Sequence, residues 1–254
     1  MRRRGVWTWI LAGLLASSAW GAPPPRLSII IDDMGQNLVQ DRRVLALKAP
    51  VALAIMPDTP YGADLAREAH RAERTVILHL PMDPAGGPYA WHPELSAQER
   101  LNRLEKALST VPYVSGVNNH EGSRMTADRP AMTQLMAILQ DRHLFFLDSR
   151  TSAATVAAAE AQKAALASLS RDVFLDNVNE PEAIAAQLRE AVRLARQQGT
   201  AVLIGHPRPA TLDVLTRELP KLMAEGVEVI DIEQMIALRG NQAMAAHGKQ
   251  GLYR

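Results

Sequence analysis

Short apolar segments alternate with longer amphipathic segments along most of the chain. The apolar segments are rich in Val, Ile and Leu, which is typical of parallel strands that are buried on both faces. They predict strands at Leu27–Ile31, Val51–Met56, Thr75–Leu80, Tyr113–Val117, Leu144–Leu147, Asp172–Leu175, Ala201–Ile204 and Val227–Ile230. The amphipathic segments predict helices at Ala63–Ala72, Ala97–Ser109, Ala131–Asp141, Ala153–Ala167, Pro181–Gln198 and Thr211–Ala224. Such a series of βα units indicates either a barrel or a doubly wound sheet.

Several predicted helices have recognisable ends. Ser96 precedes Glu99 in a Ser-x-x-Glu capping box, and Pro181 occupies a favourable first helical position. Gly199 and Gly226 stand where two helices should end. These residues support the assignment of the amphipathic segments to helices.

Polar residues gather directly after the predicted strands. The clusters are Asp32-Asp33, Pro57-Asp58, His79–Met82, Asn118–Arg124, Asp148–Thr151, Asp176-Asn177 and Gly205–Pro209. The C-terminal ends of barrel strands converge on one mouth, where the active sites of such folds lie. Packing alone does not explain the clusters, because buried charges are costly unless they are paired or bind a metal. We therefore expect one α/β domain over residues 23–238, a single distorted barrel of seven or eight βα units.

The N-terminal segment has the composition of a secretory signal peptide. Arg2–Arg4 precede the uncharged apolar segment Val6–Ala16, and small residues follow through Ala22. The apolar segment is shorter than the roughly 20 residues of a membrane-spanning helix. We assign residues 1–22 to a signal peptide and expect a periplasmic protein with no stable membrane insertion after its removal; an uncleaved signal anchor is the alternative. Residues 239–254 lack apolar periodicity and are predicted to form a flexible tail.

Removal of the signal segment changes the net charge. The whole chain has 28 Lys and Arg residues against 27 Asp and Glu, and the mature chain has 25 against 27, a net charge of −2. We therefore expect no nucleic-acid partner. The chain has no cysteine, so a metal would need His and carboxylate ligands. Coiled-coil heptads are absent, and the pattern specifies no oligomeric state.

Four of these clusters supply candidate catalytic or metal-binding side chains. Asp32 and Asp33 are adjacent acids at a buried strand end, where one can bind a metal and the other can take a proton from water. His79 lies within an apolar segment, His120 in a loop rich in Asn, Gly and Ser, and His206 directly after a strand. Each also has a structural interpretation, since Asp is common in caps and turns and a lone His is often a core residue.

Other polar residues of these clusters are candidates for substrate contacts or for a second layer of the site. Asp148 and Asp176 either cap the following helices or orient a histidine. Arg124 either pairs with one of these acids or holds an anionic substrate, and Asn119 and Ser123 lie in the same cluster.

One carboxylate and two imidazoles suit a hard or borderline divalent cation, and Zn²⁺ fits this set best. Such a site keeps coordination positions open for water and for a substrate oxygen. The cation lowers the pKa of water toward about 7 and polarises a carbonyl group. A second carboxylate can then take the proton, and a histidine can protonate the leaving amine.

Five ordered motifs of the chain resemble the divergent polysaccharide deacetylase family. They are Ile29–Gly35, His79–Met82, Gly116–Arg124, Phe146–Thr151 and Ile204–Pro207. The resemblance covers nearly the whole mature chain. This family is related to the wider NodB-like polysaccharide deacetylases, so the resemblance implies a distorted barrel and a carbohydrate substrate.

The resemblance also implies roles for single residues. Asp32 matches the proposed base, Asp33 matches a metal ligand, and His206 matches the proposed acid. The wider family takes two metal ligands from one His-x-x-x-His motif, whereas no second histidine follows His79 at that spacing. By geometric inference, His120 on the next βα unit is the natural substitute.

Three functions are compatible with these observations. The first is a periplasmic metal-dependent hydrolase that removes acetyl groups from a polysaccharide or a peptidoglycan-derived glycan. The second is a non-catalytic protein that binds an envelope glycan or partner in the barrel mouth, which the missing His-x-x-x-His motif favours. The third is a hydrolase for another amide or a phosphoester, because Arg124, Arg150 and Arg208 would suit an anionic substrate. Aromatic residues are few, and Tyr89 and Trp91 are the candidates for a sugar contact.

Overall fold

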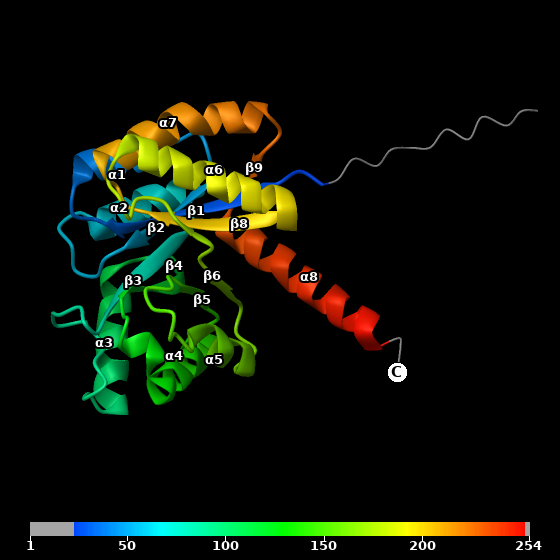
Figure 1. Cartoon of the computed structure of the whole chain (residues 1–254). Helices are drawn as coiled ribbons and strands as arrows, with labels where there is room; N and C mark the ends of the chain where they lie inside the picture. The colour runs from blue at the N-terminus through cyan, green and yellow to red at the C-terminus, as the bar shows by residue number, and fades with distance from the viewer. Residues whose placement is uncertain (1–22, 252–254) are drawn as a thin grey trace, which may run out of the picture.

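The computed structural model describes residues 23–251, with side chains described through residue 242 (Figure 1). The strands are β1 (Arg26–Met34), β2 (Val51–Ile55), β3 (Val76–Met82), β4 (Val114–Glu121), β5 (Phe145–Asp148), β6 (Ser168–Ser170), β7 (Val173–Phe174), β8 (Thr200–Gly205) and β9 (Glu228–Val229). The helices are α1 (Leu38–Leu45), α2 (Gly62–Arg71), α3 (Ala97–Thr110), α4 (Arg129–Asp141), α5 (Ala157–Lys163), α6 (Pro181–Gln198), α7 (Pro209–Ala224) and α8 (Ile232–Gly251), with a 3₁₀ turn η1 (Met125–Ala127).

The described strands form one parallel sheet that curls into a half-barrel. Their order is β6-β5-β4-β3-β2-β1-β8-β7, and β9 pairs with the start of β1. Among the described strands no pairing joins β6 to β7, so the barrel is open at that seam. Figure 1 shows α6 and α7 above the curled sheet and α3, α4 and α5 below it. These helices cover the outer face of the sheet, where their apolar side chains join one cluster with those of the strands.

The alternation of side chains along each strand creates two hydrophobic cores. Leu27, Ile29 and Ile31 on β1 pack in the outer core, between the sheet and the helices. The inner core lies inside the curled sheet and consists of Ile30, Ala52, Ala54, Ile77, Phe145, Leu147, Leu169, Val202, Ile204, Ile232 and Met235. Ile232 and Met235 come from the first turns of α8, which follows β9 at the N-terminal ends of the strands. Helix α8 therefore closes the interior at that end and leaves the opposite end for polar residues.

The predicted α/β barrel fold is confirmed, and all eight predicted strands are present. Four described elements lie outside the predicted set: α1, η1, α8 and the strand β6. Strand β6 has three residues and is too short to show an alternating pattern. The prediction that His120 lies in a loop is wrong, because β4 continues through Glu121. Its pairing with β3 extends to the register Pro81↔His120 and outweighs the low strand propensity of asparagine.

The sequence predicts a signal peptide at the N-terminal end of the chain and a flexible tail at the C-terminal end. Residues 1–22, the predicted signal peptide, lie outside the described residues. Helix α8 continues past Arg239 to Gly251, so most of the predicted tail is helical, and its flexibility stays a prediction. Within residues 23–251, none of the helices combines the length and the apolar character that crossing a bilayer requires.

Candidate metal and acid-base site

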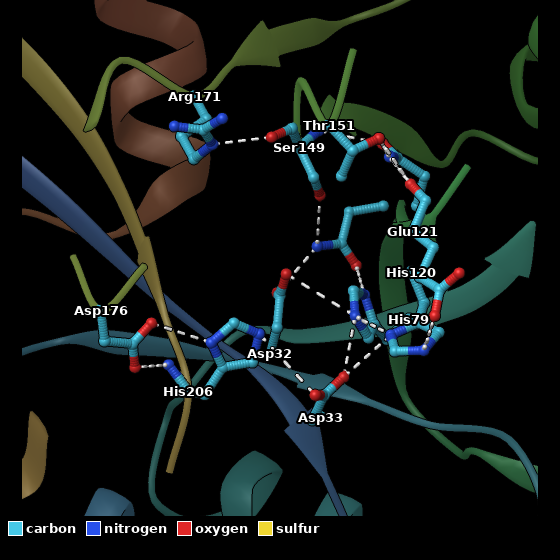
Figure 2. Close-up of polar contacts among 12 residues, drawn as sticks. Asp32, Asp33, His79, His120, Glu121, Ser149, Thr151, Arg171, Asp176 and His206 are labelled. Carbon is cyan, nitrogen blue, oxygen red and sulfur yellow. Dashed lines mark hydrogen bonds and ion pairs between the residues drawn. The ribbon is translucent and has the colours of Figure 1, made fainter. Parts of the chain in front are cut away.

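The C-terminal ends of the strands bring acids and histidines together from distant parts of the sequence (Figure 2). Side chains alternate between the two faces of a strand, and this alternation explains which of them point into the half-barrel at the strand ends. Asp32 continues the inward series of Ile30 on β1, and His206 continues that of Ile204 beyond β8. His79 continues that of Ile77 on β3. A polar layer thus follows the inner core where the strands end.

Asp33 breaks this alternation. In a regular strand it would point away from Asp32, because adjacent side chains face opposite sides. The register between β1 and β2 shifts between Ile31 and Met34, and Asp33 has a positive φ of 57°. A non-glycine residue pays of the order of 1 kcal/mol or more for this conformation. The irregularity turns the Asp33 carboxylate into the site, so both adjacent acids face it.

Asp33, His79 and His120 form a compact group of possible metal ligands. Oδ1 of Asp33 lies 3.3 Å from Nε2 of His79 and 2.9 Å from Nδ1 of His120, and these two nitrogens are 3.2 Å apart. All three ligand atoms lie within 4.8 Å of one another. Oδ1 of Asp33 is buried and makes no hydrogen bond of good geometry. A carboxylate oxygen left unsatisfied between two imidazole nitrogens fits a divalent cation, and this donor set is that of zinc sites.

The charges in this group favour an ionised Asp33. Burial opposes its ionisation, but the imidazoles of His120 and His79 outweigh burial and hold the pKa of Asp33 well below its usual range. Burial also disfavours a charged His79, but Asp32 and Asp33 beside it raise its pKa. The two carboxylates therefore attract positive charge to this point, which either a proton on His79 or a bound divalent cation can supply.

Asn118 connects the ligand group to the second acid. Its amide nitrogen donates to Oδ1 of Asp32 at 2.8 Å and to Oγ of Ser149 at 3.2 Å. Its amide oxygen lies 2.8 Å from Nδ1 of His79. Asp32 is almost fully buried, and this burial raises its pKa, although His79, His206 and the Asn118 bond oppose the shift. A buried acid whose pKa is raised is a better proton acceptor than an ordinary carboxylate.

His206 stands on the other side of Asp33 with an acid of its own. Nδ1 of His206 lies 2.9 Å from Oδ1 of Asp176, and Nε2 lies 3.7 Å from Oδ2 of Asp33. The backbone N–H of His206 and the hydroxyl of Thr211 both donate to Oδ2 of Asp176. Burial lowers the pKa of His206, but the bond to Asp176 and its charge outweigh burial and raise it. The arrangement orients the ring and favours its protonated form.

Two predicted residues of the second layer lie on the outward side of their strands. Asn119 is buried, and its side chain accepts from the backbone N–H of Ser149 and donates to the carbonyl of Glu121. Asp148 accepts from the backbone N–H of Arg150 and from the hydroxyl of Thr155. Both side chains therefore hold the loops around the site and have no described contact with its histidines.

The other two predicted residues lie at the rim. Ser123 is exposed, and within the described residues it makes no side-chain hydrogen bond. Arg124 lies 3.3 Å from Asp83 and 3.5 Å from Glu94. Asp83, Glu94 and His92 form a second cluster of metal-ligand types, but the guanidinium of Arg124 places a positive charge in it. The structure does not bring Ser123 or Arg124 to the acid-histidine group.

The aromatic candidates for a sugar contact also fall outside the group. Trp91 is fully buried beside Arg100, whose guanidinium lies 5.9 Å from the ring centre, so the prediction for Trp91 is wrong. Tyr89 is partly buried and packs against the outer core. The loop that carries both residues returns to pair with the end of β3, which buries the indole.

Sequence reasoning missed Asn118, Ser149, Arg171 and Thr211 as parts of the site. Asn118 could have been found, because it shares strand parity with His120 and stands opposite His79 in the register of β3 and β4. Arg171 carried no such signal. Its guanidinium donates to the carbonyl of Ser149 (Figure 2) and to the carbonyl of Arg150. Only the folded loops bring these carbonyls within reach.

The sequence matches the family model described as divergent polysaccharide deacetylase over residues 29–236. The chain belongs to this family. A protein of Haemophilus influenzae described as uncharacterized is 39% identical over 201 residues, which are 78% of this chain and 72% of that protein. The uncharacterized protein YibQ of Escherichia coli is 37% identical over 194 residues, 75% of this chain and 61% of YibQ.

Solved structures share the fold of this deacetylase family member at low sequence identity. The uncharacterized protein ATU2773 from Agrobacterium tumefaciens has a TM-score of 0.80 with 22% identity, over 85% of this chain and 90% of that one. The catalytic domain of a peptidoglycan N-acetylglucosamine deacetylase from Eubacterium rectale has a TM-score of 0.55 with 14% identity, over 84% and 93%. BA3943 from Bacillus anthracis, described as a pseudoenzyme of the CE4 family, has a TM-score of 0.57 with 14% identity, over 84% and 66%. The fold thus occurs in a deacetylase and in a pseudoenzyme.

Proposed function

We propose that this protein is a metal-dependent hydrolase that removes acetyl groups from an N-acetylated glycan. One observation carries the proposal. Oδ1 of Asp33, Nε2 of His79 and Nδ1 of His120 converge on one point, with Asp32 on one side and His206 on the other. The family supports a hydrolase acting on a carbohydrate. The solved deacetylase with this fold supports the N-acetyl bond as the target.

Asp33, His79 and His120 would hold the cation, for which Zn²⁺ is the best candidate. A bound divalent cation supplies Lewis-acid polarisation of the amide carbonyl. The bond between Nδ1 of His79 and Asn118 leaves Nε2 of His79 free to face the ligand point. This arrangement keeps the ring oriented before any ligand arrives.

Asp32 and His206 divide the proton transfers between them. Asp32 takes a proton from the attacking water, because its buried carboxylate has a raised pKa and is held by Asn118. His206 gives a proton from Nε2 to the leaving amine, because Asp176 binds Nδ1 and favours the imidazolium form. Two groups with separate orienting partners, on two sides of Asp33, match the base and acid of amide hydrolysis.

A non-catalytic glycan-binding protein is the alternative. The missing His-x-x-x-His motif favours it, and a pseudoenzyme shares the fold. The Asp176–His206 pair argues for catalysis, because a binding protein has little need of an acid with a raised pKa and its own carboxylate. Export to the periplasm is part of the proposal and rests on the composition of residues 1–22.

Metal content is the first measurement. The mature chain from residue 23 should retain or take up about one equivalent of a divalent metal, as a three-ligand site implies. Asp33→Asn, His79→Ala and His120→Ala should each lose it, whereas His70→Ala, which replaces a histidine outside the site, should keep it. Failure of the wild-type chain to bind any divalent metal would exclude the metal-dependent hydrolase.

Acetate release from acetylated glycans is the second measurement. Asp32→Asn and His206→Ala should retain metal but lower turnover by about 10²–10⁴-fold, the usual contribution of general acid-base catalysis. Metal binding with no acetate release from any acetylated glycan would favour the non-catalytic alternative.

A further inference from the structure

A pocket of about 610 Å³ lies beside the acid-histidine group, between the loop after β5 and helix α6. Arg150 and Thr151 line it from the loop, Arg171 and Phe174 from the segment around β7, and Asn177 from the turn that follows. The volume is in the range of small-ligand sites. None of these side chains is used by the proposed acid-base chemistry.

Two guanidinium groups share this pocket. Arg171 is held in place, since its Nε donates to the carbonyl of Ser149 at 2.7 Å and its NH2 group donates to the carbonyl of Arg150 at 2.9 Å. The Arg171 guanidinium also lies 4.9 Å from the ring centre of Phe174. Burial, and then the charge of Arg150, lower the pKa of Arg171, so the two cations are close enough to repel. Like charges kept together in one pocket point to an anionic occupant.

The acids around the pocket are engaged elsewhere. Asp172 accepts from Arg239 and from the backbone N–H of Val202. Glu190 pairs with Arg193 on the same helix. Within the described part of the chain, the side chain of Arg150 forms no ion pair, and Arg171 bonds only to backbone carbonyls. The charge of Asp148 acts on both guanidinium groups, but its carboxylate bonds to the backbone N–H of Arg150 and the hydroxyl of Thr155. Neither guanidinium therefore forms an ion pair with a carboxylate among the described residues.

The pocket adjoins the reacting groups through a shared wall. Phe174 contacts the ring of His206 edge-on, with ring centroids 5.5 Å apart, and the Arg171 guanidinium lies over the same Phe174 ring. Thr151 lines the pocket and donates to the carbonyl of Glu121, the residue after His120. A ligand in the pocket would therefore sit next to a substrate at His206.

We propose that Arg150 and Arg171 form a subsite for an anionic group, a carboxylate or a phosphate, on the glycan substrate. The inference rests on the proposed function, because it assigns the pocket to the same substrate as the Asp32–His206 site. Arg171 provides the fixed cation and Arg150, whose side chain is exposed, closes on the anion. Guanidinium groups suit both anions because their N–H groups can bind two oxygens at once.

Three probes with the same acetylated sugar ring can test this subsite. N-acetylmuramic acid carries a carboxylate, N-acetylglucosamine 6-phosphate carries a phosphate, and N-acetylglucosamine is neutral. Their dissociation constants are measured by calorimetry with the metal-loaded chain at low salt. We expect at least one acidic sugar to bind about tenfold more tightly than the neutral one, the factor that corresponds to about 1.4 kcal/mol. The acidic sugar that binds more tightly than N-acetylglucosamine shows whether the subsite prefers a carboxylate or a phosphate.

Arg150→Gln is the main variant, since its backbone contacts remain and Arg171 stays in place. It should remove the preference for the acidic sugar and leave metal content and the affinity for N-acetylglucosamine unchanged. Arg189→Gln is the matched control, because it removes the same charge from an exposed position of α6 outside the pocket. Arg171→Lys should lower the preference in part, because the charge remains while the two-pronged geometry is lost.

Equal binding of acidic and neutral sugars, no detectable binding of the acidic sugars, or equal effects of Arg150→Gln and Arg189→Gln would overturn the inference. These outcomes in a chain that binds metal and releases acetate would leave the proposed function intact. A preference that depends on Arg150 in a chain without metal or acetate release would overturn the proposed function and not the anion site.

Discussion

The side-chain oxygen of Asn118 lies 2.8 Å from Nδ1 of His79 and determines which nitrogen of that ring faces the site. The amide nitrogen of Asn118 is directed at the Asp32 carboxylate, which leaves the amide oxygen for His79. Nδ1 of His79 must then donate, and Nε2 carries the free lone pair. One buried amide thus couples the orientation of a metal ligand to that of the proposed base.

Replacement of Asn118 by alanine should weaken metal binding. The imidazole of His79 loses the partner that fixes its tautomer, and such losses lower metal affinity by about 10–100-fold. A competition titration with a chelating dye measures the affinity. Asn119→Ala is the neighbouring control, since Asn119 bonds to backbone groups outside the ligand set. An Asn118→Ala chain with the wild-type metal affinity would refute this role.

Replacement of Asp176 by asparagine should lower the pKa of His206. The carboxylate stabilises the imidazolium form, so its loss favours the neutral ring. The signal of His206 in an NMR titration should move to lower pH, and the alkaline limit of acetate release should move in the same direction. Asp64→Asn, on the exposed face of α2, should change neither. A shift of the His206 pKa to higher values would contradict the proposed role of Asp176.

Asp41 should make the stability of the protein depend on pH. It is fully buried and accepts from the backbone N–H of Gly35, in the turn after β1, but burial outweighs this bond and raises its pKa from 3.8 to about 6. The stability contributed by the protonated acid is fully present below pH 3.8 and is lost as the pH rises through about 6. Asp41→Asn should therefore gain stability relative to the wild type between about pH 4 and pH 7. The gain is at most about 3 kcal/mol, from roughly two pKa units.

Urea unfolding of both chains across this pH range, with a chelator present so that metal binding does not contribute, measures the difference. Asp64→Asn serves again as the exposed control. A difference between Asp41→Asn and the wild type that stays constant with pH would show that Asp41 is ionised in the fold without cost.

Ile232→Ala should destabilise the fold by about 2–4 kcal/mol, the usual cost of such a truncation in a core. Ile232 is fully buried at the start of α8 and belongs to the inner core of the half-barrel. Chemical denaturation measures the change, and Glu233→Ala, the exposed neighbour, should have an effect below about 0.5 kcal/mol. An effect of Ile232→Ala as small as that would mean that α8 does not close the interior.

The sequence by itself determined the fold class and the place of the site. Uninterrupted apolar segments of strand length, separated by amphipathic segments, specify parallel strands covered by helices. Polar residues that follow those segments must meet at one end, because parallel strands share a direction. Asp32, His79 and His206 could be placed there without coordinates, since each lies near or directly after the end of a predicted strand.

Only the tertiary structure decided how the neighbours of these residues point. Asp33 faces the site because the β1–β2 register shifts and its φ is positive, which no local pattern indicates. Pairing with β3 extends β4 through both Asn118 and Asn119. Adjacent side chains of a strand face opposite sides, so Asn118 points into the site and Asn119 points away from it. Arg171 reaches its partners across loops that are near only in the fold. Side-chain parity and loop contacts depend on inter-strand register, and register is a property of the whole sheet rather than of any one segment.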